Sequence, residues 1–369
     1  MENEKRKESV SRAIIGTLTL AAFFLILCST DVAIEYMKKG LVLCSSTVIP
    51  SLFPFMVISE LIVSSGIGVS ISRILRRPMR AIFGVGEAGA AAFLLGTVCG
   101  FPIGAVTAAS MHDKGIISKD DLEHFLIFCN NPGSAFVISA VGASLFGNKK
   151  LGLLLYVSVI LSSVTVGMVG RFFLPKSKPD STVVILSTPS KDITSRITDS
   201  IRSSALSMLT VCAYVLFFSA LVGCIGAALE SFSLPNEVRA VIFGFFELSS
   251  GAEAASSVPT PTLAIVLCAL FLGWSGLSVH LQIMSVCSGR GISFKPYIIA
   301  KAFQGFISAT LTYIAIKFLF PKLPSHSLGT FAPKESAFYR VLYTLSTAFF
   351  IASAVFLVCE KLCVKKNKK

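Results

Sequence analysis

The chain has 369 residues, of which 53% are hydrophobic and 14% are charged, and its mean hydropathy is +0.77. A soluble domain carries about 25% charged residues, so this chain has too few polar side chains to cover a water-soluble surface. The formal net charge of +13 would suit nucleic acid, but the basic residues lie between and beside apolar stretches. Positive charges placed in this way orient membrane helices and meet anionic headgroups. The composition therefore excludes a soluble globular domain, and we expect no nucleic-acid partner.

Apolar stretches follow one another along the chain, separated by charged or Pro/Gly-rich joints. They run over 13–30, 40–66, 88–111, 122–146, 151–174, 204–229, 238–258, 262–288, 297–320 and 340–360. A helix needs about 20 apolar residues to cross the hydrocarbon layer. We therefore predict an all-α polytopic membrane protein, a duplicated helical bundle with interrupted helices and re-entrant hairpins. The first stretch lacks a clear signal-peptide cleavage site, and we interpret it as a retained helix.

The two halves of the chain resemble each other. The segment from Gly100 to Lys119 matches the segment from Gly276 to Lys295 without a gap, and shorter matches precede both. Duplicated halves with interrupted helices are typical of transporters, whose substrate sites lie where broken helices expose backbone groups. The predicted division is a basic segment with the first helix at 1–39, a first repeat at 40–174, a polar linker at 175–203, a second repeat at 204–360 and a basic tail at 361–369.

The number of membrane crossings is left open. Both termini are basic, which places both in the cytoplasm and requires an even number of crossings. Two equal halves plus one extra helix give an odd number. Either 13–30 does not fully cross, or one half contains a re-entrant hairpin that the other lacks. Segment 238–258, interrupted by Glu247, Gly251 and Glu253, is the best hairpin candidate.

Glu60 is an ionisable residue within an apolar stretch. Such a side chain at the bilayer centre costs about 2.5–3.5 kcal/mol on insertion scales, so its presence needs a reason. Pro50 and Pro54 precede it, and we expect them to break the helix and to free carbonyl groups beside a wet cavity. Glu60 is then either a coupling site for a proton or cation, or a carboxyl satisfied by a neighbouring helix.

Two further strings in the first half are poor helix formers. The string Gly96 to Gly104 contains three glycines and Pro102, which predicts an opened backbone around Gly100. Close helix packing through small residues is the alternative. Asn130 and Asn131 precede Pro-Gly, and their paired amides offer donors and acceptors to a solute. An ordinary turn at the membrane surface is an equal alternative.

The second half has its own polar strings. Ser278, His280 and Gln282 alternate after Gly276, a spacing that shares one face in an extended segment but not in a helix. The nearby glycines favour an extended break, and His280 suits a proton carrier because imidazole titrates near neutral pH. A hydrogen-bonded structural histidine is the alternative. With Glu60 for ion coupling, the candidate solute-binding residues are Gly100, Pro102, Asn130, Asn131, Glu247, Ser278, His280 and Gln282.

Other site chemistries find no support in the sequence. The ten cysteines lie almost entirely in apolar stretches, without Cys-x-x-Cys pairs or zinc-type Cys/His spacing, and we interpret them as packing residues. The chain has no Gly-rich phosphate loop, no His-Glu-x-x-His and no Gly-x-Ser-x-Gly string. We therefore expect no enzyme, no cofactor and no metal.

Several of these strings resemble a known family, the sporulation integral membrane proteins of the YlbJ type. These proteins carry the nucleoside-recognition or Gate domain shared with concentrative nucleoside transporters and a ferrous-iron permease. The matching strings span residues 40–320 and are Pro50-Ser-Leu-Phe-Pro-Phe with Ser59-Glu60-Leu61, Gly100-Phe-Pro-Ile-Gly-Ala105, Asn130-Asn-Pro-Gly133, Gly244-Phe-Phe-Glu-Leu with Gly251, and Gly276-Leu-Ser-Val-His-Leu-Gln282. The resemblance implies two Gate-like repeats in the envelope of a developing spore.

The resemblance also implies a class of solute. A small aromatic or heterocyclic metabolite is expected, with dipicolinate as the first candidate and a nucleoside as the second. The expected partners are this solute, membrane lipid and a coupling proton or cation, in a bacterial cell or forespore membrane, and a homo-oligomer is left open. The alternative function is a non-transporting membrane scaffold for spore-envelope assembly.

Overall fold

The structure is a computed structural model that describes residues 13, 16, 17, 19–65, 77, 79–86, 89–174, 192–230 and 232–319. Regular structure within these ranges is helical, without strands. Four helices in them are long and apolar enough to cross a membrane, namely Lys149–Gly170, Ile193–Glu230, Pro261–Val286 and Lys295–Phe318. A bent pair, Thr19–Cys28 and Thr30–Ser46, makes a fifth if it counts as one span. The predicted all-α polytopic membrane fold is confirmed. The apolar stretch 340–360 lies outside the described residues.

The first part of the chain is helical through both of its prolines. Helix α2 (Thr30–Leu43) continues into a π-helical turn, η1 (Cys44–Val48), and then into α3 (Ile49–Ser64), which contains Pro54. The prediction that Pro50 and Pro54 break the helix is therefore wrong. The π-helical turn η1 ends just before Pro50, and local π-helical adjustments of this kind let a membrane helix accommodate proline.

The rest of the first half consists of short helices with marked ends. They are η2 (Met79–Phe83), α5 (Gly89–Val98), α6 (Ile103–Asp113), α7 (Lys119–Cys129), η3 (Phe136–Leu145) and α8 (Lys149–Gly170). Ser118 and Asp121 form a capping box at the start of α7, and Asn148 accepts hydrogen bonds from two backbone N–H groups at the start of α8. The backbone opens between α5 and α6, as predicted for Gly100 and Pro102.

The second half begins with the longest helix. It contains α9 (Ile193–Glu230), α10 (Asn236–Phe246), α11 (Leu248–Ser256), α12 (Pro261–Trp274), α13 (Gly276–Val286) and α14 (Lys295–Leu319). Helix α9 begins inside the segment 175–203 that was predicted as a linker, because the polar residues after Ile193 include no proline or glycine to stop it. Ser275 and Gly276, with φ of 77° and 79°, take the left-handed conformation that separates α12 from α13.

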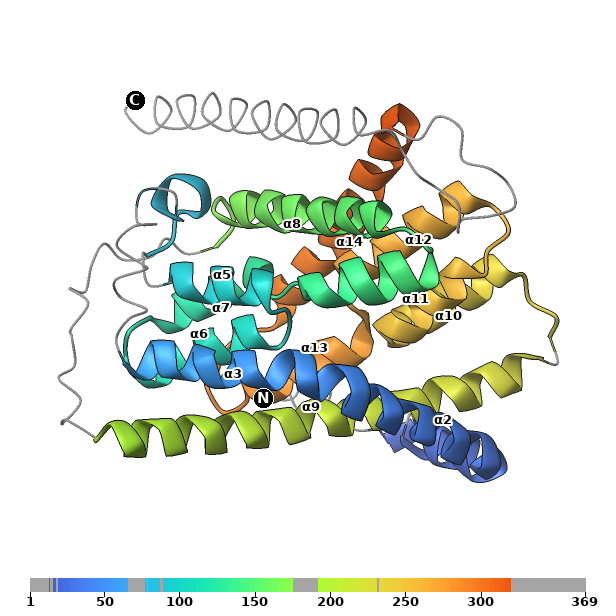
Figure 1. The fold of residues 1–369 in the computed structure, drawn as a ribbon, viewed down its shortest axis with the longest axis horizontal. Coiled ribbons are helices and arrows are strands. Elements are labelled where there is room, and N and C mark those ends of the chain that lie inside the picture. The colour runs from blue at the N-terminus through green and yellow to red at the C-terminus, as the bar shows by residue number, and fades with distance from the viewer. Residues whose placement is uncertain are drawn as a thin grey trace.

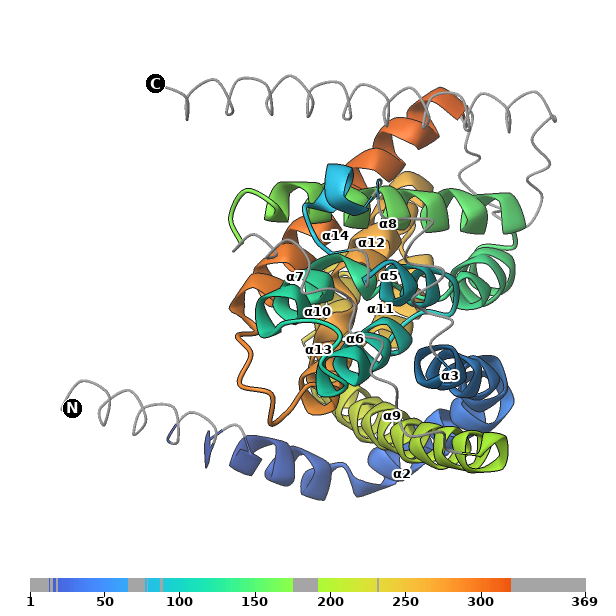
Figure 2. The ribbon, with the colours of Figure 1, turned by 90° about the vertical axis from the view of Figure 1, so that its left-hand side faces the viewer.

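The helices pack in layers around the short elements. Helices α2, α3 and α9 lie along one side of the molecule and α8 lies on the opposite side (Figures 1 and 2). Helix α14 packs against α12, α8 and α7. One apolar core joins α7 to α13 and α14, and a second joins α8 to α11, α12 and α14. Both cores therefore depend on α14.

Segment 238–258 folds into two short helices that lie against each other. A Cβ atom built on Gly251 would overlap the backbone of Gly244, so the axes of α10 and α11 approach as closely as two glycines allow. This helical hairpin is the segment that the sequence singled out as the best hairpin candidate.

We predict that Gly251→Ala destabilises the protein while Gly16→Ala does not. The new methyl group has no room at Gly251, where the backbone of Gly244 must move, and overpacking of this kind costs about 1–3 kcal/mol. Gly16 serves as the control, because no atom lies within 4 Å of the position that its new methyl group would take. Thermal unfolding of the purified protein in detergent measures both variants. Equal melting temperatures for Gly251→Ala and the parent would contradict the close packing of α10 and α11.

Candidate functional site

The two interrupted helices of the first half meet at their breaks. Gly100, with φ of 93°, lies so close to Gly133 that a Cβ atom would overlap the Gly133 backbone. The Phe101 N–H donates to the Asn131 carbonyl at 2.8 Å, and the Ser134 hydroxyl donates to the Val98 carbonyl at 3.1 Å. The structure thus brings the predicted residues Gly100, Pro102, Asn130 and Asn131 together.

Asn130 and Asn131 lie in the interior and not in a surface turn. Both residues are 0% exposed. The Asn130 Nδ2 donates to the Leu126 carbonyl at 3.2 Å, and the Asn131 Nδ2 donates to the Phe128 carbonyl at 3.0 Å and to Ser163 Oγ at 3.3 Å. The two amides therefore satisfy carbonyl groups at the end of α7, where the helix no longer supplies donors. The alternative of an ordinary surface turn is wrong.

Helix α14 supplies two further polar residues at this break. Lys301 Nζ donates to the Asn130 backbone carbonyl and to Gln304 Oε1, the latter at 2.9 Å. Gln304 Nε2 donates to Asn131 Oδ1 at 2.8 Å and to the Val159 carbonyl at 3.4 Å. Both residues are 0% exposed. We call the set Asn130, Asn131, Ser163, Lys301 and Gln304 the Lys301 network.

Lys301 has an unusual electrostatic setting. Its hydrogen-bond partners are two amide carbonyl oxygens, and across the parts of the chain that the structure describes no carboxylate forms an ion pair with it. Lysine is almost never fully buried unless it is paired. A buried charge without a counter-ion costs several kcal/mol. The network therefore holds an amine whose charged form would be solvated only by dipoles.

Lys301 and Gln304 were missed by the sequence reasoning, although a signal was present. Lys301 follows the start of the apolar stretch 297–320 closely enough to look like a flanking positive charge. Helical spacing instead indicates a buried position, because polar residues recur at intervals of three and four residues, at Lys301, Gln304, Ser308 and Thr312. Such spacing places them on one face of α14, and the exposed Phe303 and Phe306 occupy the other.

Ser278, His280 and Gln282 are not in an extended break. All three lie inside α13 and are buried, so the expectation that they share one face is wrong. The left-handed turn at Ser275 and Gly276 already accommodates the change of direction, and the helix resumes at once. Gln282 Nε2 donates to Ser278 Oγ at 3.4 Å, one helical turn away.

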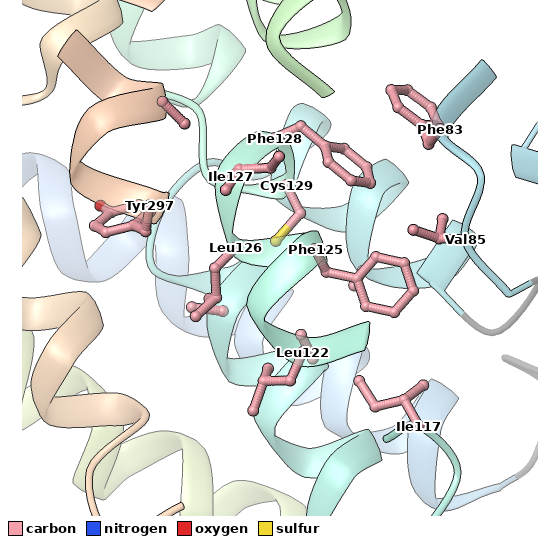
Figure 3. Close-up of a cluster of buried hydrophobic side chains, with 14 of the residues drawn as sticks. Phe83, Val85, Ile117, Leu122, Phe125, Leu126, Ile127, Phe128, Cys129 and Tyr297 are labelled. Atoms are coloured by element: carbon pink, nitrogen blue, oxygen red, sulfur yellow. The ribbon is translucent and has the colours of Figure 1, made fainter. Parts of the chain in front are cut away.

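His280 points to different neighbours. Its Nδ1 atom lies 3.0 Å from the Tyr297 hydroxyl, and its ring packs edge-on against Trp274, with 4.3 Å between ring centroids. Tyr297 belongs to α14 and lies at the edge of an apolar cluster that includes Phe125 and Leu126 of α7 (Figure 3). His280 Nε2 has no partner among the described residues. His280 thus connects α13 to α14 through Tyr297, which lies one helical turn before Lys301.

Glu247 has a structural task at the second pair of breaks. Its Oε1 and Oε2 atoms accept hydrogen bonds from the Ser249 and Ser250 N–H groups at 3.0 and 2.7 Å, which caps α11. Gly276 packs against the Glu247 backbone, so these two breaks also meet. Glu253, in contrast, is exposed.

Glu60 lines a polar cavity of about 440 Å³ between α3, α6, α9 and α13. Its Oε1 atom accepts hydrogen bonds from Lys114 Nζ at 3.1 Å and from Ser110 Oγ at 3.3 Å. The structure agrees with the interpretation in which a neighbouring helix supplies a partner for the Glu60 carboxylate. The role of Glu60 in ion coupling stays a prediction. These partners are not members of the Lys301 network.

A second ion pair lines the same cavity. Arg290 Nε and Nη2 donate to the two Asp113 carboxylate oxygens at 2.8 and 2.5 Å. This hydrogen-bonded guanidinium holds the pKa of Asp113 below its usual value. Asp113 ends α6 and Arg290 follows α13, so both helices run from an interior break to this cavity. Where side chains are described, no three His, Cys, Asp or Glu residues are placed to hold a metal ion.

We predict that Tyr297→Phe lowers the stability of the protein. The substitution leaves the buried His280 Nδ1 without its partner, at a cost of about 1–3 kcal/mol. Tyr313→Phe, in the same helix, is the control because Tyr313 is 44% exposed. Thermal unfolding in detergent compares the two variants with the parent. The hydrogen bond contributes nothing if Tyr297→Phe melts at the same temperature as Tyr313→Phe.

Comparison with known proteins identifies a relative. Sporulation integral membrane protein YlbJ of Bacillus subtilis (strain 168) is 28% identical to the chain over 343 residues, which cover 83% of the chain and 84% of that protein. No protein-family model and no solved structure matches the chain. The predicted resemblance is confirmed at the level of this relative, and with its long apolar helices the chain is an integral membrane protein related to YlbJ.

Proposed function

We propose that the chain moves a small anionic metabolite across a membrane during spore formation, and that the Lys301 network holds the solute. The observation that carries the proposal is the fully buried Lys301, which lacks a carboxylate partner in the described residues and lies at an interrupted helix. Dipicolinate is the first candidate solute and a nucleoside is the second.

The cost of the buried cation supports transport over a scaffold. Replacing a buried ion by an apolar side chain of similar volume is often neutral or stabilising, so stability alone gives no reason for a lysine here. Ionisable residues inside membrane segments mark solute or ion pathways. A scaffold for spore-envelope assembly needs long apolar helices but has no use for such a group.

The chemistry of the network favours an anion. Lys301 presents a point charge, and the Asn130, Asn131 and Gln304 amides lie beside it with N–H donors. In the structure these donors are satisfied by carbonyl oxygens, which a carboxylate can replace with a stronger, charge-assisted hydrogen bond. A nucleoside would use the amides but would leave the lysine charge without a partner. Dipicolinate, with two carboxylates on an aromatic ring, uses both.

The cavity on the α6 and α13 side fits an entrance for an anion. Its acidic residues Glu60 and Asp113 are each paired with a basic residue, Lys114 and Arg290 respectively, so the lining carries balanced charge. Glu247 is likewise neutralised in part by the N-terminus of α11. Glu60, Asp113 and Glu247 therefore do not oppose a negatively charged solute.

The relative gives the biological setting. YlbJ is named a sporulation integral membrane protein, and a chain related to it over most of its length fits a cell or forespore membrane. Solutes stored in spores must cross such a membrane. Membrane lipid and a coupling proton or cation complete the partners that we propose.

We predict that Lys301→Met lowers uptake of dipicolinate at low solute concentration by about 10- to 100-fold without unfolding the protein. The purified protein is placed in liposomes, and entry of labelled dipicolinate is followed, with a labelled nucleoside as the comparison. A lost charge-assisted hydrogen bond is worth about 1.5–3 kcal/mol, or about 10- to 100-fold in affinity. Lys317→Met is the control, because Lys317 lies in the same helix but is exposed.

Two outcomes would contradict different parts of the proposal. Wild-type rates in a folded Lys301→Met variant would remove the site from the Lys301 network. Failure of the parent protein to take up either solute would remove transport of these solutes, and would leave the scaffold as the better function. A melting temperature of Lys301→Met at or above that of the parent shows that any loss of uptake is not a loss of fold.

We predict that Glu60→Gln changes the dependence of uptake on pH or on the coupling ion. Glutamine keeps the size and hydrogen bonding of the side chain but removes the charge that pairs with Lys114. Glu35→Gln is the control, because Glu35 forms an exposed ion pair with Lys39 on α2. Initial rates of uptake are measured across a pH series and with different cations. An unchanged profile in Glu60→Gln would show that Glu60 is only a structural partner of Lys114.

A further inference from the structure

The polar face of α14 continues beyond the Lys301 network. Ser308 and Thr312 lie about one and two turns past Gln304 on the same face, and both are 0% exposed. On the same helix, Ala315 and Ile316 belong to the apolar core that α8, α12 and α14 share. Two hydroxyl groups are therefore enclosed in an otherwise apolar part of the bundle.

These hydroxyl groups have no hydrogen-bond partner within the described ranges, and neither has Ser158 Oγ on α8. A serine or threonine inside a helix ordinarily donates to the carbonyl one turn before it. Thr310 does so on the opposite face of α14, where its Oγ1 lies 2.8 Å from the Phe306 carbonyl. A buried polar group without a partner costs about 1–3 kcal/mol. Ser158 adjoins Val159, whose carbonyl accepts from Gln304 Nε2, so the three groups lie on two helices that pack against each other. Together they indicate a partner that the closed bundle does not supply.

The cavity and the hydroxyl groups of α14 lie toward different ends of this helix. Arg290 lines the cavity and stands five residues before Lys295, where α14 begins, so the cavity lies toward the N-terminal end of α14. Ser308 and Thr312 extend from Gln304 toward the C-terminal end. The cavity and the hydroxyl groups are therefore on opposite sides of the Lys301 network.

We infer that Ser158, Ser308 and Thr312 line a polar route between α8 and α14, which is closed here and which gives water and an anionic solute passage between the Lys301 network and the end of the bundle away from the cavity. This inference rests on the proposed function. Hydroxyl groups suit such a route because they donate to a carboxylate or to water without holding the solute by charge. The cavity and this route would then open in turn on either side of one site.

Thiol labelling tests the route without following transport. Ser308→Cys and Thr312→Cys are made in the full chain in liposomes and treated with the small reagent 2-sulfonatoethyl methanethiosulfonate, which stays anionic at every working pH. Mass spectrometry of peptides reads each position, so the native cysteines do not interfere. Cys268, fully buried in α12 within the same apolar core, reports labelling through local unfolding. Phe306→Cys reports the outward face of α14, where Phe306 is 66% exposed.

We expect Ser308→Cys and Thr312→Cys to react at least about tenfold faster than Cys268, in proportion to the open population. We expect no reaction at Phe306→Cys, because a charged reagent does not enter the lipid beside it. Added dipicolinate should change the rate at the two α14 positions only. If one of these variants does not fold, Ser158→Cys on the facing helix takes its place.

The outcome is separable from that of the uptake experiment. Ser308→Cys and Thr312→Cys as unreactive as Cys268, with and without dipicolinate, would overturn the route. Reactive cysteines in a protein that takes up no dipicolinate would support the route and overturn the proposed solute. Equal reactivity at Phe306→Cys and Thr312→Cys would show general exposure of α14 and would also overturn the route.

Discussion

The hydrogen bonds between α14 and the break after α7 are the contact on which the arrangement depends. Lys301 and Gln304 come from the second half of the chain, and Asn130 and Asn131 come from the first. Without Lys301 the buried Asn130 carbonyl would lack this donor, and without that carbonyl the lysine amine would keep only Gln304 of its own helix as a partner. Each half therefore satisfies a polar cost created by the other, in the helix that also joins the two apolar cores.

Sequence reasoning located the interruptions better than it located the side chains around them. Glycine and proline act on the backbone of their own neighbours, so the opening at Gly100 and Pro102 was predictable from a few residues. The prolines before Glu60 act in the same local way, but the helix continues through them after a π-helical turn. No pattern in the sequence predicts that turn. The alternation from Ser278 to Gln282 suggested an extended segment, although a two-residue left-handed turn was sufficient.

The burial of Lys301 could not be predicted from its local sequence. A lysine near the start of an apolar stretch has the same local sequence whether it lies at the membrane surface or in the bundle. Only the packing of α14 against its neighbouring helices decides, and that packing includes long-range contacts such as the close backbone approach of Gly305 to Gly273 of α12. The predicted duplication of the chain stays a prediction, as do the roles of the candidate solute residues.

The ion pair between Asp113 and Arg290 has a consequence for how the bundle responds to its medium. The Asp113 side chain is 51% exposed, and dissolved ions weaken exposed charge pairs within a Debye length of about 8–10 Å. The bonds around Lys301 are shielded from such ions. Ionic strength therefore acts on the rim where α6 and α13 are tied together, and leaves the interior contact between the halves as it is.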